Sequence, residues 1–106
     1  MTVQEFLKDT YKEGPYIFRP HVLCADGYKV SIQAGNGLYS CPRANVVEYT
    51  AVELGFPNMA DDLIMKYAED PDEPTDTVYG YVPVEVVQQL MDKHGGIVEL
   101  VGRGGI

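Results

Sequence analysis

Hydrophobic and polar positions in the last third of the chain predict a strand, a helix and a second strand. Thr77 to Val82 is rich in β-branched and aromatic residues, which favour a pleated, half-buried strand. Pro83 suits the first position of a helix, where its missing N–H group is not needed. Apolar residues then recur at helical spacing, at Val84, Val86, Val87, Leu90 and Met91. Gly95-Gly96 ends this helix, and Ile97 to Val101 is apolar enough for another strand.

The N-terminus predicts a short amphipathic helix. Thr2 and Glu5 have the spacing of a capping box, in which each side chain bonds the backbone N–H group of the other residue. Gly14-Pro15 ends this helix, because neither residue continues a helix well. One face of the helix carries an apolar stripe made of Val3, Phe6 and Leu7, which Tyr11 can extend.

A β-hairpin is predicted from Val22 to Ile32. The run Tyr16 to Cys24 is rich in strand-forming residues, and Pro20 predicts an edge strand or a bulge within it. Ala25-Asp26-Gly27 is a tight-turn signal. After the turn, apolar residues alternate with polar ones, which predicts a half-buried strand with the inward side chains Tyr28, Val30 and Ile32.

The middle of the chain predicts a further strand and a third helix. Gly35-Asn36-Gly37 marks a turn, and residues 38–43 are interpreted as a short strand or loop. Val46 to Leu54 is the next predicted strand, and one face of it carries Thr50, Val52, Leu54 and then Phe56. Asn58 and Asp61 have the capping spacing for a helix with the apolar stripe Met59, Ala60, Leu63, Ile64 and Tyr67.

The order of these elements defines the expected fold class. We expect a single α+β domain over residues 1–101, with a mainly antiparallel sheet of about four to five strands and about three helices packed on it. The strand–helix–strand unit at the end offers one parallel, right-handed crossover. Residues 102–106 are expected to form a flexible tail. A length of 106 residues is ordinary for one domain.

Charge is distributed unevenly along the chain and limits the classes of partner. The formal net charge is −8, yet residues 1–43 are close to neutral. Residues 44–92 carry eleven acidic side chains and one basic side chain, Lys66. Such a body repels nucleic acid and anionic membranes and attracts basic surfaces. We therefore expect no direct binding to nucleic acid or membrane.

Other features of the composition point to a cytoplasmic protein. No apolar run approaches the roughly 20 residues that span a membrane, and the N-terminus lacks the basic-then-apolar pattern of a signal peptide. Cys24 and Cys41 are too few for a disulfide framework, so they are interpreted as reduced thiols.

The densest group of acids is interpreted as a partner-binding surface. It lies in the proline-bearing segment Glu69 to Asp76. Glu69 and Asp70 stand at the end of a predicted helix, where negative charge is disfavoured by roughly 0.3–1 kcal/mol each, and they crowd against the other three acids. Local folding does not account for these acids, whereas a basic partner would. The two prolines stiffen the segment and lower the entropy cost of binding. The candidate partner-binding residues are Glu69, Asp70, Asp72, Glu73 and Asp76, with Tyr79 and Tyr81 beside them.

Other interpretations of the same residues stay open. A run of charges is also typical of a solvated surface without a partner. Tyr79 and Tyr81 share a face of their predicted strand, and that face is either sheet core or a contact platform beside the acids. Exposed tyrosine next to charge is typical of binding hot spots.

Neither a calcium site nor a phosphate-binding loop is predicted. Asp70-x-Asp72 begins like a calcium loop, but Pro74 and Thr75 stand where a ligand and the turn glycine belong. Gly35-x-Gly37 precedes no predicted helix and lacks a following lysine, so it is interpreted as a turn.

A zinc site and a catalytic group are not predicted either. The soft ligands lack the paired spacing of zinc sites, and they are His21, Cys24, Cys41 and His94. Cys24 is better explained as core, and His94 as a residue of the last helical turn. In a straight strand His21 and Cys24 face opposite sides, which excludes a Cys–His nucleophile pair. We therefore expect neither an enzyme nor a bound metal or cofactor.

Several strings of the sequence resemble the small uncharacterised proteins carried by phages and mobile elements of Gram-positive and gut bacteria. These strings are GPYIFRP, ADGYKVSIQAGNG, YAEDPDEPTDTVYGYVPVEVV and KHGGIVEL, and the resemblance spans most of the chain, from Thr2 to Leu100. It implies an anti-defence role in the cytoplasm of a bacterial host, such as that of an anti-CRISPR inhibitor. Many such inhibitors are compact and acidic and block a nucleic-acid channel by imitating its phosphate charge. The implied partner is a CRISPR effector or another nucleic-acid-binding protein.

The leading hypothesis is a small acidic inhibitor that docks on a basic protein surface, and a homodimer is compatible with it. The alternative is a protein that binds or sequesters a small molecule or nucleotide. That alternative requires convergent donors such as Arg19, Lys29 and Arg43, all in the more basic first part of the chain. A third hypothesis is a structural or assembly factor.

Overall fold

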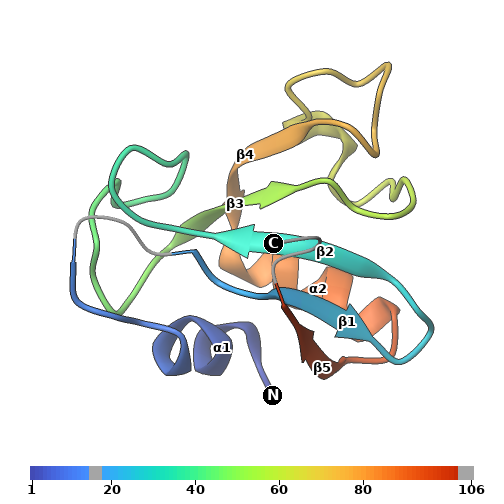
Figure 1. The fold of residues 1–106 in the computed structure, drawn as a ribbon. Coiled ribbons are helices and arrows are strands. Elements are labelled where there is room, and N and C mark those ends of the chain that lie inside the picture. Colours follow the sequence, from blue (N-terminus) through green and yellow to red (C-terminus); the bar gives the residue numbers. More distant parts are fainter. Residues whose placement is uncertain (15–17, 103–106) are drawn as a thin grey trace.

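One antiparallel sheet organises the chain. The computed structural model describes residues 1–14 and 18–102, and the strands found there are β1 (His21–Cys24), β2 (Lys29–Gln33), β3 (Ala51–Gly55), β4 (Val78–Pro83) and β5 (Ile97–Val101). Their order across the sheet is β4-β3-β2-β1-β5, and each pair of neighbours is antiparallel (Figure 1). With the helices α1 (Val3–Asp9) and α2 (Val84–Lys93), they form the expected α+β fold.

The predicted hairpin is present. Val22 of β1 pairs with Val30 of β2, and the N–H group of Gly27 donates to the carbonyl of Cys24 at 3.0 Å. Gly27 has a φ of 96°, which favours glycine at this point of the turn. The inward side chains of the second strand are fully buried, and these are Tyr28, Val30 and Ile32.

Helix α2 connects the two edges of the sheet. It follows β4 directly, lies behind the sheet in Figure 1, and leads to β5 at the opposite edge. Its buried residues are Val84, Val87, Leu90 and Met91. The predicted crossover does join two parallel strands of one sheet, since β4 and β5 run in the same direction, but β3, β2 and β1 lie between them. A helix that crosses the whole sheet covers more of the core than one between neighbouring strands.

Helix α1 begins with the predicted capping box. The side chain of Thr2 accepts the N–H group of Glu5 at 3.1 Å, and the side chain of Glu5 accepts the N–H group of Thr2 at 2.7 Å. The helix ends at Asp9, earlier than predicted, where the hydroxyl of Thr10 donates to the carbonyl of Phe6 at 2.6 Å. Its apolar stripe belongs to the same core as α2.

The helix predicted after Asn58 is wrong. The side chain of Asn58 accepts the N–H group of Lys29 at 2.9 Å and donates to the carbonyl of Gly27 at 2.8 Å, which ties it to the hairpin. Asp61 accepts a backbone N–H group two residues later and closes a turn. Only the short 3₁₀ helix η1 (Met65–Tyr67) follows in this segment. Long-range hydrogen bonds therefore take the side chain that was expected to cap a helix.

Strand β3 is shorter than predicted, and its end leaves the sheet. It begins at Ala51, and Val52 and Leu54 face the core as expected. Thr50 and Phe56, which we expected on the same buried face, are exposed. Phe56 has a φ of 50°, a left-handed conformation that interrupts the alternation of the strand.

Two predicted features lie outside the described residues. They are the start of the strand run at Tyr16 and nearly all of the expected tail, residues 103–106. In the part of the chain that the structure does describe, no helix has the length and apolar character needed to cross a membrane.

Candidate functional site

The acidic loop, defined as Glu69 to Asp76, projects from the domain between η1 and β4 (Figure 1). All of its acidic residues are exposed. The loop is folded into consecutive turns, in which the N–H group of Glu73 donates to the carbonyl of Asp70 at 3.1 Å and that of Asp76 to the carbonyl of Glu73 at 2.9 Å. The carboxylate of Asp70 also accepts the N–H group of Asp72 at 3.1 Å. The predicted acidic site residues therefore stand together on an ordered surface loop.

Further hydrogen bonds anchor the acidic loop to the start of β4. Backbone N–H groups at the beginning of the loop donate to the hydroxyl of Thr77 at 3.0 Å and to the carbonyl of Val78 at 2.9 Å. From the core side, the hydroxyl of Tyr79 donates to the carbonyl of Pro74 at 2.5 Å. An anchored loop loses little conformational entropy when it binds a partner.

No ion pair neutralises the acidic loop within residues 1–14 and 18–102. The ion pairs in those ranges join Lys93 to Asp61 and His94 to Asp26 and Asp61. The loop carboxylates repel one another, and only dissolved ions screen them. No ion pair among the described residues offsets this repulsion, which favours a role toward another molecule.

Tyr79 and Tyr81 do not share a face, so that prediction is wrong. A bulge in β4 places Gly80 and Tyr81 together opposite Glu53 of β3, and Tyr81 has a φ of 53°. The extra residue reverses the alternation, so Tyr79 is fully buried whereas Tyr81 is 47% exposed. Tyr79 supports the loop from inside and presents no surface to a partner. The glycine at position 80, inside a predicted strand, was the signal that could have revealed the bulge.

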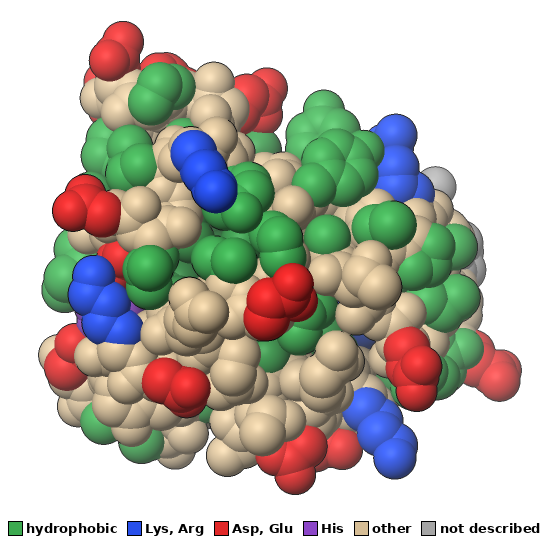
Figure 2. Space-filling model, turned by 180° about the vertical axis from the view of Figure 1, so that it is seen from behind, with side chains coloured by type: hydrophobic (Ala, Val, Ile, Leu, Met, Phe, Trp, Pro, Cys, Tyr) green, Lys and Arg blue, Asp and Glu red, His purple; other side chains and the backbone are tan. Residues whose placement is uncertain are grey.

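A shallow groove of about 350 Å³ lies beside the acidic loop, and we call it the tyrosine groove. Its lining residues are Tyr39, Tyr67, Glu69, Val78, Gly80 and Tyr81. The rings of Tyr39 and Tyr81 have centres 5.8 Å apart and planes at 38°, and both residues are exposed. Figure 2 shows acidic side chains at the top of the molecule and hydrophobic side chains gathered on the surface below them. Because Glu69 belongs to both, the acidic loop and the tyrosine groove form one continuous surface.

Two tyrosines of the groove make cation–π contacts with basic side chains of the same chain. The guanidinium of Arg43 lies 5.5 Å from the ring centre of Tyr39, and the amino group of Lys66 lies 5.3 Å from that of Tyr67. These contacts show that the rings present faces to positive charge, as expected of the aromatic quadrupole. With Glu69 at its edge, the groove combines cation-attracting rings and a carboxylate.

A second polar cluster lies at the end of α2, and the sequence did not predict it. Nε2 of His94 lies 2.7 Å from Oδ2 of Asp61, and Nδ1 lies 2.6 Å from Oδ2 of Asp26. Lys93 adds a contact of 3.1 Å to Asp61, and Tyr28 stacks on the imidazole with ring centres 4.0 Å apart. The carboxylates come from the hairpin turn and from the segment before η1, so no local spacing in the sequence indicates the cluster.

The ionisation of this cluster stabilises it. Burial lowers the pKa of His94, but the hydrogen bonds and charges of Asp26 and Asp61 outweigh burial and raise that pKa overall. Burial raises the pKa of Asp61, while a backbone N–H group, His94 and Lys93 bring it below its usual value. The N–H group of Tyr28 and the side chain of His94 lower the pKa of Asp26. Both imidazole nitrogens are engaged and the His94 side chain is 8% exposed, so the cluster joins the end of α2 to the hairpin turn and to the segment before η1.

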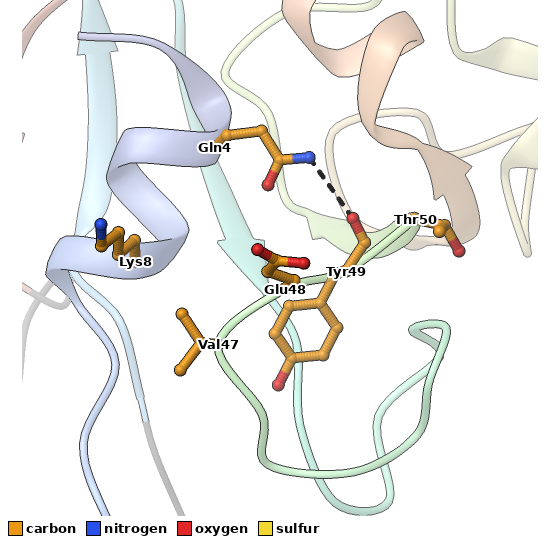
Figure 3. A pocket seen from close by; sticks show the side chains of 6 residues that line it. All are labelled: Gln4, Lys8, Val47, Glu48, Tyr49 and Thr50. Atoms are coloured by element: carbon orange, nitrogen blue, oxygen red, sulfur yellow. Dashed lines mark hydrogen bonds between the residues drawn. The ribbon is translucent and has the colours of Figure 1, made fainter.

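Another hollow, of about 610 Å³, lies between α1 and the segment before β3 (Figure 3). Its lining residues are Gln4, Lys8, Val47, Glu48, Tyr49 and Thr50. Figure 3 shows the amide of Gln4 directed at the carbonyl of Tyr49, which it meets at 3.5 Å. Lys8 and Glu48 supply one charge of each sign, so the described lining of this hollow offers a single cation to an anionic ligand.

Two of the three cations of the small-molecule hypothesis, Arg19 and Arg43, bond groups of their own chain. Arg19 is fully buried, and its guanidinium donates to the hydroxyl of Thr10 at 2.8 Å and to the carbonyl of Ala34 at 2.7 Å. The guanidinium of Arg43 donates to a backbone carbonyl at 3.0 Å. Lys29 is half-buried on β2. These positions do not favour a ligand site built from the three residues.

Cys24 is a core thiol rather than a reactive one. Cys24 is buried, as predicted, and lies 3.5 Å from the sulfur of Met91. Burial and then the charge of Asp26 raise the pKa of Cys24 to about 11, so the thiol stays protonated at neutral pH. Among the described residues, no three or more His, Cys, Asp and Glu side chains are arranged to hold a metal ion.

Comparison of the chain with protein-family models, curated proteins and solved structures finds no match. Function must therefore be inferred from the chemistry of the chain's own surface. On that surface, the acidic loop and the tyrosine groove bring exposed charge and exposed aromatic rings together on ordered backbone.

Proposed function

We propose that this protein is a binding protein that docks its acidic loop on a basic surface of another protein. The observation that carries this proposal is the acidic loop itself, where exposed carboxylates, without ion pairs to any described residue, are held in place by turns and by Tyr79. Repulsion among these carboxylates is relieved when a positive surface covers them. Exposed Tyr39 and Tyr81 add the aromatic area that dominates many binding interfaces.

The partner is expected to be a protein that binds nucleic acid. This chain would act as an inhibitor by occupying the site where the partner binds its nucleic-acid substrate. Channels that bind nucleic acid are lined with Lys and Arg, and an anchored row of carboxylates imitates phosphate charge. The same negative charge disfavours direct binding of nucleic acid by this chain. The resemblance of the sequence to phage and mobile-element proteins extends the proposal to an anti-defence role against a CRISPR effector.

The test compares two charge-reversal variants with equal change in net charge. The loop variant carries Asp72→Lys, Glu73→Lys and Asp76→Lys, and it keeps Asp70 because that carboxylate closes a turn. The control variant carries the same reversal at exposed acids outside the surface, Asp9, Glu13 and Glu48. Each protein is immobilised and exposed to bacterial lysate, and association with the captured basic protein is then timed across a salt series.

We expect the loop variant to associate with that partner about tenfold more slowly at low salt, with a smaller change in dissociation. The control variant should keep most of the association rate of the parent. Equal association rates for the parent and the loop variant at every salt concentration would show that the acidic loop is not the docking surface. An equal loss in both variants would show that only net charge matters.

Inhibition is tested with the same partner. A labelled oligonucleotide bound to it should be displaced by the parent protein and, at equal concentration, much less by the loop variant. If the oligonucleotide and the protein bind the partner together, the protein is a binding module but not a competitor of nucleic acid.

A further inference from the structure

We infer that the tyrosine groove is a specificity pocket for one arginine side chain of the partner. The inference rests on the proposed docking function, because it assigns the groove and the acidic loop to the same interface. The tyrosine groove would supply a short-range contact that selects one side chain of the partner, which the charges of the acidic loop alone do not. Long-range attraction between charges brings surfaces together but discriminates little between basic partners.

The chemistry of the lining favours a planar cation. The rings of Tyr39 and Tyr81 contact each other, with centres 5.8 Å apart and planes inclined at 38°, and both residues are exposed, so a cation from outside can stack on the free surface of this pair. Glu69 stands at the same groove as an exposed carboxylate without an ion pair among the described residues. A guanidinium can stack on a ring and donate a pair of N–H groups to a carboxylate at the same time.

The chain itself shows this mode of contact. Arg43 places its guanidinium over Tyr39 at 5.5 Å and fixes it with a hydrogen bond of 3.0 Å to a backbone carbonyl. Tyr81, by contrast, has no cation within contact distance among the described residues, although it is the more exposed of the two rings. Tyr81 and Glu69 are therefore the positions left for a cation from outside.

The backbone at Tyr81 supports a functional reason for this residue. A φ of 53° is unfavourable for any residue with a β-carbon, and glycine would fit there without strain. The strained bulge turns the ring out of the core and toward Tyr39. Gly80 next to it leaves room for that pairing, because a β-carbon at this position would come within 3.3 Å of Tyr39.

The test uses small probes rather than the unidentified partner. Blocked tripeptides Gly-Arg-Gly, Gly-Lys-Gly and Gly-citrulline-Gly are titrated into the ¹⁵N-labelled full chain, and amide shifts are followed by NMR. Citrulline has the shape of arginine without its charge, and lysine has the charge without the planar fork. We expect saturable shifts centred on Gly80, Tyr81 and Glu69 with the arginine probe, about threefold or more weaker binding of lysine, and no saturable binding of citrulline.

Two variants of the groove check the assignment. Tyr81→Gly removes the ring at a position where glycine fits the backbone, and Glu69→Gln removes the charge while it keeps the backbone N–H that bonds Val78. Each should weaken the arginine probe about fivefold or more, with an otherwise parental spectrum. Equal binding of the arginine and lysine probes, shifts centred elsewhere, or parental affinity in both variants would overturn the inference.

The inference and the proposed function fail separately. Against the full partner, Tyr81→Gly, which leaves the loop charge intact, should speed dissociation and leave association at low salt near the parental rate, whereas the loop variant slows association. One outcome would contradict the arginine pocket alone. In it, the loop variant associates slowly, while the groove variants dissociate as slowly as the parent. Parental association of the loop variant would sink the docking function, whatever the tripeptides show.

Discussion

Nε2 of His94 lies 2.7 Å from Oδ2 of Asp61, and this contact joins the end of α2 to the segment that leads into the acidic loop. The other imidazole nitrogen holds Asp26 in the hairpin turn at 2.6 Å. One buried side chain thus ties together three segments that are far apart in the sequence. Its protonation state therefore affects how firmly these three segments are joined.

Stability should be highest where His94 is protonated and its carboxylates are ionised. The pKa of His94 is raised above its ordinary value of 6.5 in the folded protein, so its contribution is complete below about pH 6.5 and is lost as the pH rises through the folded pKa. The pKa values of Asp26 and Asp61 are lowered from 3.8, so their contribution is present above that pH and is lost as the pH falls through the folded values. The unfolding free energy, measured with urea between pH 3 and 9, should show both the loss at high pH and the loss at low pH.

Substitution of each histidine in turn separates the contributions of His94 and His21 to the pH dependence of stability. His94→Gln should remove the decline of unfolding free energy above about pH 6.5. His21→Gln is the control, because burial and Lys29 lower the pKa of His21, and a lowered histidine pKa makes stability rise with pH up to about 6.5. The control variant should therefore keep the alkaline decline. A decline that persists unchanged in His94→Gln would assign it to another group.

Tyr79→Phe should loosen the acidic loop without changing its charge. The substitution removes the hydroxyl that donates to Pro74 and should cost about 1 kcal/mol of unfolding free energy. Amide hydrogen exchange in residues 70–76 should speed up, while exchange in β1 and β2 follows the global change only. Unchanged exchange in the loop would show that the turns alone order it.

Tyr28→Phe is a matched contrast to that change. The hydroxyl of Tyr28 is also buried, but it finds no hydrogen-bond partner among the described residues. Its removal relieves an unsatisfied polar group, so the unfolding free energy should stay the same or rise by up to about 1 kcal/mol. Thermal unfolding of the two variants side by side measures the difference, and a loss in Tyr28→Phe as large as that in Tyr79→Phe would contradict it.

Local patterns predicted the parts of the fold that local forces decide. The hairpin at residues 22–32 carries its turn chemistry in Ala25-Asp26-Gly27, and α2 carries a full apolar stripe. The third helix failed because Asn58, an ordinary capping residue, bonds the hairpin instead. Nothing near Asn58 in the sequence distinguishes these two uses of one side chain.

The candidate site was predicted in its charge but not in its shape. Exposure of the acids follows from composition and prolines in one segment, and the structure agrees. The relation of Tyr79 to Tyr81 depends on one inserted residue, which moves one ring into the core and the other to the surface. Tyr39 reaches the groove from a segment about 40 residues earlier, and this proximity becomes visible only in the folded chain.

Arg19→Lys should destabilise the fold although it keeps the charge. The guanidinium of Arg19 is fully buried and donates hydrogen bonds to the hydroxyl of Thr10 and to the carbonyls of Ala34 and Leu7. The amino group of a lysine cannot reach all of these acceptors. We expect a loss of about 1–3 kcal/mol in urea unfolding. Arg43→Lys, at an exposed position, is the control and should change stability by about 0.5 kcal/mol or less. Equal effects would show that burial of Arg19 is not what makes it important.

Glycine and alanine substitutions at Tyr81 and Tyr39 should rank in opposite orders. At Tyr81 the φ of 53° strains any β-carbon, so Tyr81→Gly should be more stable than Tyr81→Ala by about 1 kcal/mol. Tyr39 is similarly exposed and is not in the left-handed region, so Tyr39→Ala should be more stable than Tyr39→Gly by about 0.5–1 kcal/mol. Both substitutions of a pair remove the same ring. The difference in unfolding free energy within each pair, measured with urea, therefore reports the conformational preference of the backbone. The same ranking at both positions would mean that Tyr81 is not strained, and the functional reason for its conformation would disappear.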